Sequence, residues 1–438
     1  MLRHVGRTLQ SDGRRKGPDA VPEGIVRLRR RSRTESPTYV DSSAIWSNTV
    51  CPNGVIVRSA SGGVAISETT QNQKKDWVNI AFLSLTPVIG IFGTAAWTWT
   101  HGFHLWMPVL LVVMYSLVGF SICAGYHRFF SHKTYEASPV VQAFFAFFGA
   151  MAAENSILWW SSSHRIHHKH VDKDWDPYNI KRGFWWAHMI WIFVKNEQFD
   201  DTFANSPDLL KNPIVMWQNK WHKMILIGAG FGIPTLIGAA FGNPIAGLLW
   251  GGFLRIAVVH HTTFFVNSLA HSLGKPLFNS EVSARDNWFV AMLTLGEGYH
   301  SFHHRFPNDF RNGIRWYQWD PSKWLISALK SLGLATDLRT ASMPQIEQAR
   351  MQAALHTVKT QIESTPGTLG DEIRRRAHVA MEHLETALKL WRQHAEEKAA
   401  GVSKSWRETR RRSRQHVQQS RRQWKWVVRT LQRLPEAA

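Results

Sequence analysis

Histidine is the residue type whose spacing in this sequence most clearly indicates chemistry. Eight of the 22 histidines fall in three short clusters. The clusters are an H-x4-H pair, His127 and His132, and two H-x2-H-H groups, His164, His167 and His168, and His300, His303 and His304. On a helix, residues three or four positions apart share a face, so each H-x2-H-H group can present two or three imidazoles to one point. The H-x4-H pair is one residue longer and suits a helix end where the last turn opens.

The number and type of these ligands narrow the choice of metal. Imidazole binds iron, copper, nickel and zinc well, but a zinc site is filled by four ligands, commonly with cysteine sulfur among them. The two cysteines, Cys51 and Cys123, form no CxxC pattern. Eight clustered histidines exceed one mononuclear site, so two metal ions with open coordination positions fit better. Iron with open coordination positions can activate O2, so two Fe ions are the expected cofactor.

Long uncharged segments must position these clusters. Residues 78–99 and 102–126 contain no Asp, Glu, Lys or Arg, and each is long enough to cross an apolar layer of about 30 Å. Residues 224–254 are also uncharged but too long for one crossing, and Gly242-Asn243-Pro244 interrupts them. We therefore expect four membrane helices, at about 78–99, 102–126, 222–241 and 245–268. The last contains Arg255, and a charge within a membrane helix indicates a functional site by default.

The segment 137–163 is a fifth apolar stretch, with Glu154 as its only charge. If it crossed the membrane, the cluster at 164–168 would lie on the opposite side from the first cluster, and the ligands could not meet. We therefore expect this segment to be peripheral or re-entrant. Basic residues beside the clusters, such as Arg128 and Arg165, indicate that the ligands lie on the cytoplasmic side.

Both ends of the chain are basic. Residues 1–74 have no periodic apolar face and are expected to form a disordered tail, followed by a membrane domain at 75–340 and a basic helical extension at 341–438. The formal net charge of +20 indicates an anionic partner. Near its end the extension combines Arg and Lys with Trp424 and Trp426, a pattern that favours a membrane surface. No nucleic-acid partner is expected.

Taken in order, the motifs resemble the membrane fatty-acid desaturases of the stearoyl or Δ9 type over about residues 75–340. The resemblance rests on the segments 124–132, 163–170, 176–179, 183–186, 266–271 and 296–307. It implies an all-α integral membrane fold, with four transmembrane helices under a cytoplasmic helical cap that carries a histidine-rich di-metal site. It also implies nine histidine ligands, of which His271 is the ninth, and a water-mediated ligand, Asn267.

The implied activity is that of an acyl-CoA-type desaturase. Such an enzyme uses O2 to remove two hydrogens from a saturated acyl chain in a bent hydrophobic tunnel, and leaves a cis double bond, here expected at Δ9. Asn155, Trp160 and His261 are expected to line the tunnel, and His260 and His261 are expected to be polar tunnel or packing residues rather than ligands. Neither end shows a haem-binding pattern, so a separate electron donor, such as a ferredoxin or a cytochrome b5-type carrier, is expected. The expected location is a bacterial inner membrane.

Two departures leave alternatives open. Acyl-CoA-using members carry charged residues just before the second histidine cluster, where this chain has Ser161-Ser162-Ser163, and a basic pair is reduced to Lys195-Asn196. The acyl group could therefore be linked to CoA, to a carrier protein or to a lipid. A di-iron alkyl or lipid hydroxylase uses similar clusters, although the Gly296–His300 motif favours a desaturase. A histidine-rich metal carrier would need polar residues within several spans, whereas these ligands lie outside them.

Overall fold

The structure is a computed structural model that describes residues 47–50, 56–59, 74–195, 202–364, 367–399 and 403–431. The chain divides into two compact units, Met1–Gln71 and Asn72–Ala438. The described part of the first unit is one antiparallel pair of strands, β1 (Ser47–Val50) and β2 (Ile56–Ser59). The rest of the N-terminal segment that was expected to be disordered, up to residue 73, lies outside the described residues.

Three helices of the second unit are long and apolar enough to cross a membrane. They comprise Trp77–His101, Trp106–Ser131 and Pro213–Ala240, and they overlap three of the four expected spans. Each contains a π-helical stretch between or after its α-helical parts. In chain order the parts are α1 (Trp77–Val88), η1 (Ile89–Gly93), α2 (Thr94–His101), α3 (Trp106–Phe120), η2 (Ser121–Ser131), α8 (Pro213–Ile225), η5 (Leu226–Phe231) and α9 (Gly232–Ala240).

The helix at the fourth expected span is present but is not among these three apolar helices. It runs through α10 (Pro244–Gly247), η6 (Leu248–Leu254) and α11 (Arg255–Ser272). The side chain of Arg255 is fully buried and donates hydrogen bonds to the backbone oxygens of Met151, Gly230 and Gly251. These carbonyls satisfy the guanidinium N–H groups, so Arg255 ties neighbouring segments together.

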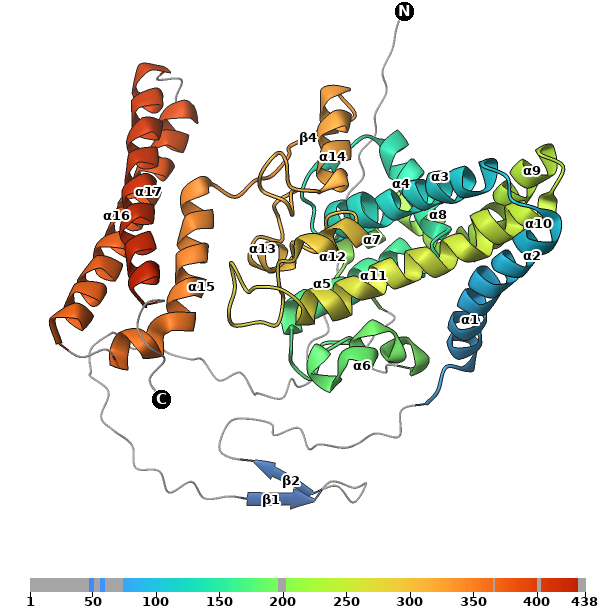
Figure 1. Ribbon diagram of the computed structural model, residues 1–438, viewed down its shortest axis with the longest axis horizontal. Helices are drawn as coiled ribbons and strands as arrows, with labels where there is room; N and C mark the ends of the chain where they lie inside the picture. Colours follow the sequence, from blue (N-terminus) through green and yellow to red (C-terminus); the bar gives the residue numbers. More distant parts are fainter. Residues whose placement is uncertain are drawn as a thin grey trace, which may run out of the picture. The chain divides into compact units, whose positions relative to one another are not determined.

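The turns that close the two helical hairpins lie beside each other. Trp97 Nε1 donates to Asn243 Oδ1 over 3.3 Å, and the rings of Trp106 and Phe241 stack with centroids 5.0 Å apart. Figure 1 shows α2, α9 and α10 meeting at the right-hand side. Gly247 permits the close approach of α9 and α10, because a Cβ there would lie 2.2 Å from the backbone oxygen of Pro234.

The segment expected to be peripheral forms two helices instead of one long span. α4 (Pro139–Ala150) has 12 residues, and its length of about 18 Å is too short to cross an apolar layer of about 30 Å. Its inner face, with Val141, Phe145 and Ala146, packs into the largest buried apolar cluster among the described residues. α5 (Ile157–His170) then follows, capped by Ser156 Oγ, which accepts from the N–H of Trp159.

Short elements complete the part of the second unit that surrounds the histidines. An antiparallel pair, β3 (Glu136–Ala137) with β4 (Ala335–Thr336), is its only paired strand element among the described residues, and the unit is otherwise mostly helical, as expected. The remaining elements are η3 (Ile180–Arg182), α6 (Phe184–His188), η4 (Ile190–Phe193), α7 (Pro207–Leu210), α12 (Trp288–Leu293), α13 (His300–Arg305) and α14 (Pro321–Ser331).

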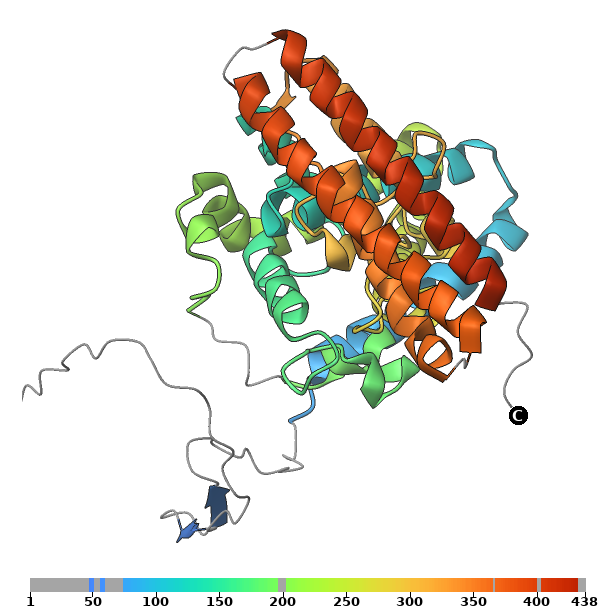
Figure 2. The ribbon, with the colours of Figure 1, turned by 90° about the vertical axis from the view of Figure 1, so that its left-hand side faces the viewer.

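Three long helices end the described chain: α15 (Met343–Ser364), α16 (Gly367–Ala399) and α17 (Ser403–Leu431). Figures 1 and 2 both show α16 and α17 side by side. Their apolar residues meet in a cluster that includes Leu384 and Val417. Ile346 of α15 packs instead against Phe278 and Phe302. The domain boundary expected at residue 340 stays a prediction, but α15 makes contacts on both sides of it.

Candidate metal centre

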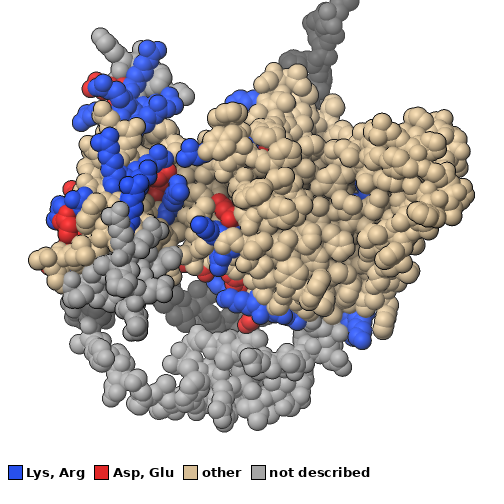
Figure 3. Space-filling view, in the orientation of Figure 1, with Lys and Arg blue, Asp and Glu red and all other residues tan. Residues whose placement is uncertain are grey.

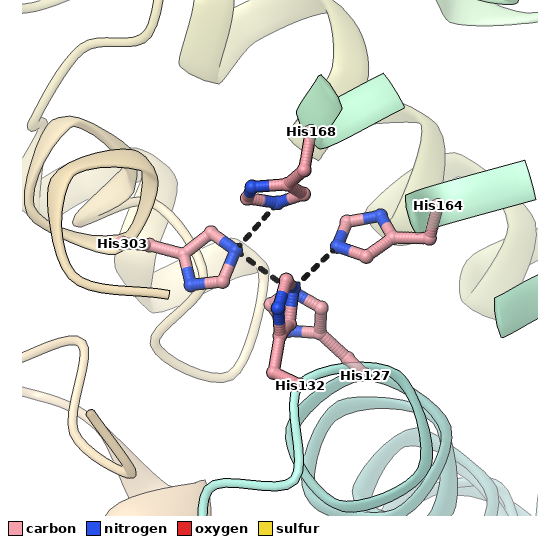
Figure 4. Close-up of side chains that lie close together, drawn as sticks. All are labelled: His127, His132, His164, His168 and His303. Carbon is pink, nitrogen blue, oxygen red and sulfur yellow. Dashed lines mark hydrogen bonds between the residues drawn. The ribbon is translucent and has the colours of Figure 1, made fainter. Parts of the chain in front are cut away.

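Nine histidines converge in two adjacent groups. The first group is His127, His132, His164, His168 and His303, and the second is His167, His271, His300 and His304. Within each group the nearest ring nitrogens all lie within 4.8 Å of one another. Figure 4 shows the rings of the first group turning nitrogen atoms toward one point. The rings of His168, from the first group, and His304, from the second, stack with centroids 4.2 Å apart, so the two groups are in direct contact.

The nitrogen spacing fits a shared cation. Six Nε2–Nε2 separations fall between 2.8 and 3.3 Å: His127–His303, His132–His164, His168–His303, His167–His304, His271–His300 and His300–His304. Ligands at 2.0–2.1 Å from one metal ion would lie roughly 3.0–3.4 Å apart. Each group could therefore hold a metal ion with little movement of the rings.

Burial disfavours the charged form of several of these histidines. It lowers the pKa of His164, His168 and His304 well below the usual range, and it lowers the pKa of His300 to about 3. Neighbouring imidazoles add to this effect. A neutral imidazole keeps a lone pair on one ring nitrogen, which is the form that binds a metal.

A buried carboxylate fixes the tautomer of His127. His127 Nδ1 donates to Glu297 Oε2 over 2.8 Å, which leaves the lone pair on Nε2, inside the first group. Arg128 binds the other Glu297 oxygen over 2.9 Å and also pairs with Asp320 over 2.9 Å. Burial alone would raise the pKa of Glu297, but Arg128 and His127 outweigh it and bring the pKa to about 2. Glu297 is therefore ionised and acts as a fixed acceptor.

The second group is oriented in the same way. His167 Nδ1 donates to Asp176 Oδ1 over 2.8 Å. His271 Nδ1 lies 2.7 Å from Ser283 Oγ, and the Ser283 hydroxyl donates to a carboxylate oxygen of Asp172. Because the single hydroxyl proton is used there, Ser283 must accept from His271. Both histidines therefore present Nε2 lone pairs to the second group.

A π-helix explains how the H-x4-H pair reaches one group. η2 carries His127, and the backbone N–H of His132 donates to the backbone oxygen of His127 over 3.2 Å. This i to i+5 bond brings residues five apart into register, which an α-helix would not do. The sequence expectation of an opened last turn is thus met by a wider helix.

A cavity of about 950 Å³ opens beside the first group, within the range of small-molecule sites. His127, His164 and Glu297 form part of its wall, and most of the remaining wall is apolar, including Phe82, Ile122, Val259 and Leu295. Trp160 also lines it, and its ring stacks on His164 with centroids 5.1 Å apart. An extended apolar ligand in this cavity would pass next to the first histidine group.

One carboxyl group faces the same cavity. Glu154 lies on the wall, where it accepts from Trp160 Nε1 over 3.0 Å and from Thr263 Oγ1 over 2.7 Å. Burial raises its pKa to about 7, and the two hydrogen bonds counter only part of that effect. Glu154 therefore fixes the indole that covers His164.

The sequence-predicted residues fall into three sets. All nine predicted histidines lie in the two groups. Asn155, Trp160 and Asn267 line the cavity, and Asn267 is one helical turn before His271 on α11. The predicted tunnel residue His261 instead bonds to His188 over 3.0 Å, and among the residues lining the cavity is its neighbour His260.

Several residues of the site were not assigned roles from sequence. Asp176 and Glu297 lie within the motif segments 176–179 and 296–307, but the motifs by themselves indicate no role for either side chain. Asp172, Ser283 and Asp320 carried no signal, because isolated polar residues in loops have no spacing that distinguishes them. Only their contacts in the fold reveal that they orient ligands.

Comparison with known proteins agrees with this geometry. The sequence model of the family "Fatty acid desaturase" matches residues 104–329. Over 282 residues the chain is 39% identical to Acyl-CoA desaturase 1 of Saccharomyces cerevisiae, covering 64% of this chain and 55% of the yeast protein. The chain thus spans little more than half the length of that relative.

Two further relatives are covered over most of their length. The sn-2 palmitoyl-lipid 9-desaturase of Nostoc sp. is 32% identical over 291 residues, covering 66% of this chain and 98% of the relative. Stearoyl-CoA desaturase 5 of Homo sapiens is 32% identical over 293 residues, covering 63% of this chain and 84% of the relative. All nine histidines of the two groups lie within residues 104–329, the region that the family model matches.

Proposed function

Since the chain belongs to the fatty acid desaturase family, we propose that it is an O2-dependent acyl desaturase that introduces a cis double bond into a saturated fatty-acyl chain. The proposed position of the double bond is Δ9. The observation that carries the proposal is the pair of buried histidine groups beside an apolar cavity. The family relationship supports the acyl substrate, and the geometry supports the oxidative chemistry.

Each histidine group is proposed to hold one iron ion. The ligands are the five histidines of the first group and the four of the second, with Asn267 as a water-mediated ligand of the second. When bound, iron supplies the activation of O2. Imidazole also binds zinc and copper, so the choice of iron rests on the reaction and is tested by metal analysis.

The protein's own residues bind and orient the acyl chain. The apolar wall of the cavity removes the chain from water, which favours binding by the hydrophobic effect. Trp160 and Glu154 hold a rigid surface beside His164, so a chain that passes there keeps a fixed position relative to the first group. Exclusion of water also protects a reactive site from side reactions.

The electron balance requires a further partner. Forming the double bond breaks two C–H bonds and yields two electrons and two protons, whereas reduction of one O2 to two waters consumes four of each. A separate carrier, such as a ferredoxin or a cytochrome b5-type protein, is proposed to supply the other two electrons, with two protons from solvent. The names of the relatives include CoA-linked and lipid-linked substrates, so a CoA, carrier-protein or lipid link is retained for the acyl group.

The proposed membrane arrangement has four spans under a cytoplasmic cap. The fourth is Pro244–Ser272, where backbone carbonyls satisfy the buried Arg255. The adjacent hairpin turns support this arrangement, because they lie together while the histidine-bearing ends of the same helices meet elsewhere. Cytoplasmic sidedness and a bacterial inner membrane remain predictions.

A di-iron alkyl or lipid hydroxylase is the alternative, because it would need the same ligands and cavity. The two reactions differ in product: an alkene for a desaturase and an alcohol for a hydroxylase. The family match favours the alkene.

The test is expression of the full chain in a host, with fatty-acid profiling and metal analysis of the purified protein. His167→Ala and His303→Ala, one from each group, should abolish the new alkene and lower the iron content. His170→Ala removes a histidine from the same helix as His167 but from neither group, so it should keep both. New alcohols instead of alkenes would favour the hydroxylase, and full turnover by His167→Ala would contradict the ligand assignment.

A further inference from the structure

The last helix, α17, carries a stripe of cations on one face. Arg411, Arg414, Arg422, Lys425 and Arg429 are all exposed. Their spacings of three, four and eight residues place them within one narrow sector of a helix. The stripe is about 27 Å long at 1.5 Å per residue.

The packing of α17 fixes the direction in which this stripe points. Val417 and Val427 on the opposite face are buried in the contact with α16. Ser413 Oγ donates to the backbone oxygen of Ala387 over 2.8 Å, and Ser420 Oγ donates to that of Ala380 over 2.7 Å. With this face held against α16, the basic face is turned outward.

None of the five stripe residues forms an ion pair within the described part of the chain. The ion pairs of the three C-terminal helices there join Asp371 and Glu372 to arginines of α16, and Glu347 to Arg421. None includes the five stripe residues. Figure 3 shows Lys and Arg gathered over the C-terminal helices at the left, while most of the right-hand surface is tan. The stripe is therefore an exposed cationic surface.

The same packing removes the apolar wedge that a membrane-inserting helix needs. The sequence pattern predicts that Trp424 and Trp426 lie at a lipid interface, but both pack against the α16–α17 core around Ile373 and Val427. Among the described side chains of α15–α17, only Met343 and Leu369 are exposed large hydrophobic residues. The surface offers charge without an apolar anchor, which favours a soluble anionic partner over insertion into lipid.

The stripe is connected to the metal centre through α15. Arg421 pairs with Glu347, and Ser420 Oγ lies 3.3 Å from Met351 Sδ. On its other side, α15 packs Ile346 against Phe302, which lies between His300 and His303 on α13. A partner bound at the stripe would thus be held by elements packed directly on a ligand-bearing helix.

We propose that the α17 stripe docks an acidic one-electron carrier protein that reduces the metal centre. This inference rests on the proposed function, because that reaction needs two external electrons per double bond. Two successive encounters would deliver one electron each, and two protons from solvent would complete the reduction of O2 to water. A row of cations accelerates association with an acidic protein and makes it sensitive to salt.

The test compares two matched double variants of the full, metal-loaded protein in detergent. Arg414→Glu with Lys425→Glu reverses two charges of the stripe. Lys389→Glu with Arg392→Glu reverses one arginine and one lysine that are exposed on α16. The probes are a purified acidic [2Fe–2S] ferredoxin and a soluble cytochrome b5 haem domain. The carrier of interest is the one of the two that supports product formation by the wild type. The stripe variant should bind this carrier roughly tenfold more weakly at low salt, and the affinity of the control variant should stay within about twofold of that of the wild type.

Product assays separate failure of docking from failure of the proposed function. With a small chemical reductant in place of the carrier, the stripe variant should form product as fast as the wild type. Equal loss of carrier binding in both variants would overturn the proposal, as would tighter stripe-dependent binding to anionic vesicles or to duplex DNA than to either carrier. If the wild type forms no alkene with any reductant, the proposed function fails, and the binding comparison still reports on the stripe.

Discussion

At the scale of single residues, the metal centre depends on hydrogen bonds that lie behind the histidines. Asp176 accepts from His167 Nδ1 and also from the backbone N–H groups of Asp172 and Tyr178. These bonds hold the carboxylate still, so the imidazole can present only Nε2 to the second group. The orientation of a ligand is thereby built from a loop outside the ligand cluster.

Replacing Asp176 tests this role. Asp176→Asn keeps the shape but removes the charge that stabilises the His167 N–H donor. Iron affinity or activity should fall roughly 10- to 100-fold, measured by metal titration and product formation. Asp174→Asn removes an exposed carboxylate two residues away and should change little. Equal effects of the two substitutions would show that general electrostatics, and not the hydrogen bond, is responsible.

The buried carboxyl of Glu154 predicts a pH dependence of stability. Its pKa rises from 4.5 to about 7 on folding, so the folded state binds its proton more tightly than the unfolded state. Between these two values the free energy of unfolding therefore falls as pH rises. Glu154→Gln does not titrate. The apparent Tm of the wild type should drop relative to that of Glu154→Gln between about pH 5 and pH 8, whereas a constant difference would contradict the raised pKa.

At the scale of elements, irregular helices place the ligands. The π-helix η2 brings His127 and His132 into one group, and the short α4 allows α5 to return to the side of the first cluster. A regular α-helix at η2 would turn His127 and His132 to different sides, and one continuous helix through residues 139–170 would carry the second cluster away from the first. The chemistry therefore depends on where regular helix geometry is interrupted.

Cysteine labelling tests the proposed topology. Cys51 and Cys123 are first replaced by alanine, and single cysteines are then placed at His104, Ala240 and Lys173, which are all exposed. His104→Cys and Ala240→Cys flank the two adjacent hairpin turns and should react with an impermeant reagent from the outer side. Lys173→Cys should react only after the membrane is opened. Labelling of all three positions from one side would exclude the four-span arrangement.

At the scale of the whole molecule, the C-terminal helices contribute to two different structures. α15 covers Phe302 beside the two histidine groups, whereas α16 and α17 bury their apolar faces mainly against each other. The extension is thus not a single appendage. Its first helix contacts both the histidine-bearing helix α13 and the α16–α17 hairpin, and that hairpin presents the basic stripe.

Two truncations separate these parts. Ending the chain after Pro366 removes α16 and α17 and should leave iron content near that of the full protein. Ending it after Thr340 also removes Ile346 from its contact with Phe278 and Phe302. Loss of such a buried aliphatic contact costs about 2–5 kcal/mol, so the shorter protein should lose iron and unfold at a lower temperature. Equal iron content and Tm in both truncations would show that α15 is dispensable.

The sequence alone determined which histidines could be ligands and where most membrane helices lie. Both follow from local spacing: the H-x2-H-H groups share a helix face, and uncharged segments of sufficient length form apolar helices. The ninth proposed ligand, His271, came only from the resemblance, because it stands outside any cluster. The fourth helix could not be judged from its charge alone, since the partners of Arg255 lie on segments distant in the chain.

The tertiary structure decided which side chains act together. Arg128 and Asp320 are separated by 192 positions, and Ser283 and Asp172 by 111, so no local period links them. Long-range contacts also determine which face of α17 is buried. Its sequence carries both tryptophans and arginines, and only the packing of α16 against one face determined that the tryptophans turn inward and the cations outward. Local periodicity fixes the faces of an element, but the partner that covers a face is chosen by long-range contacts.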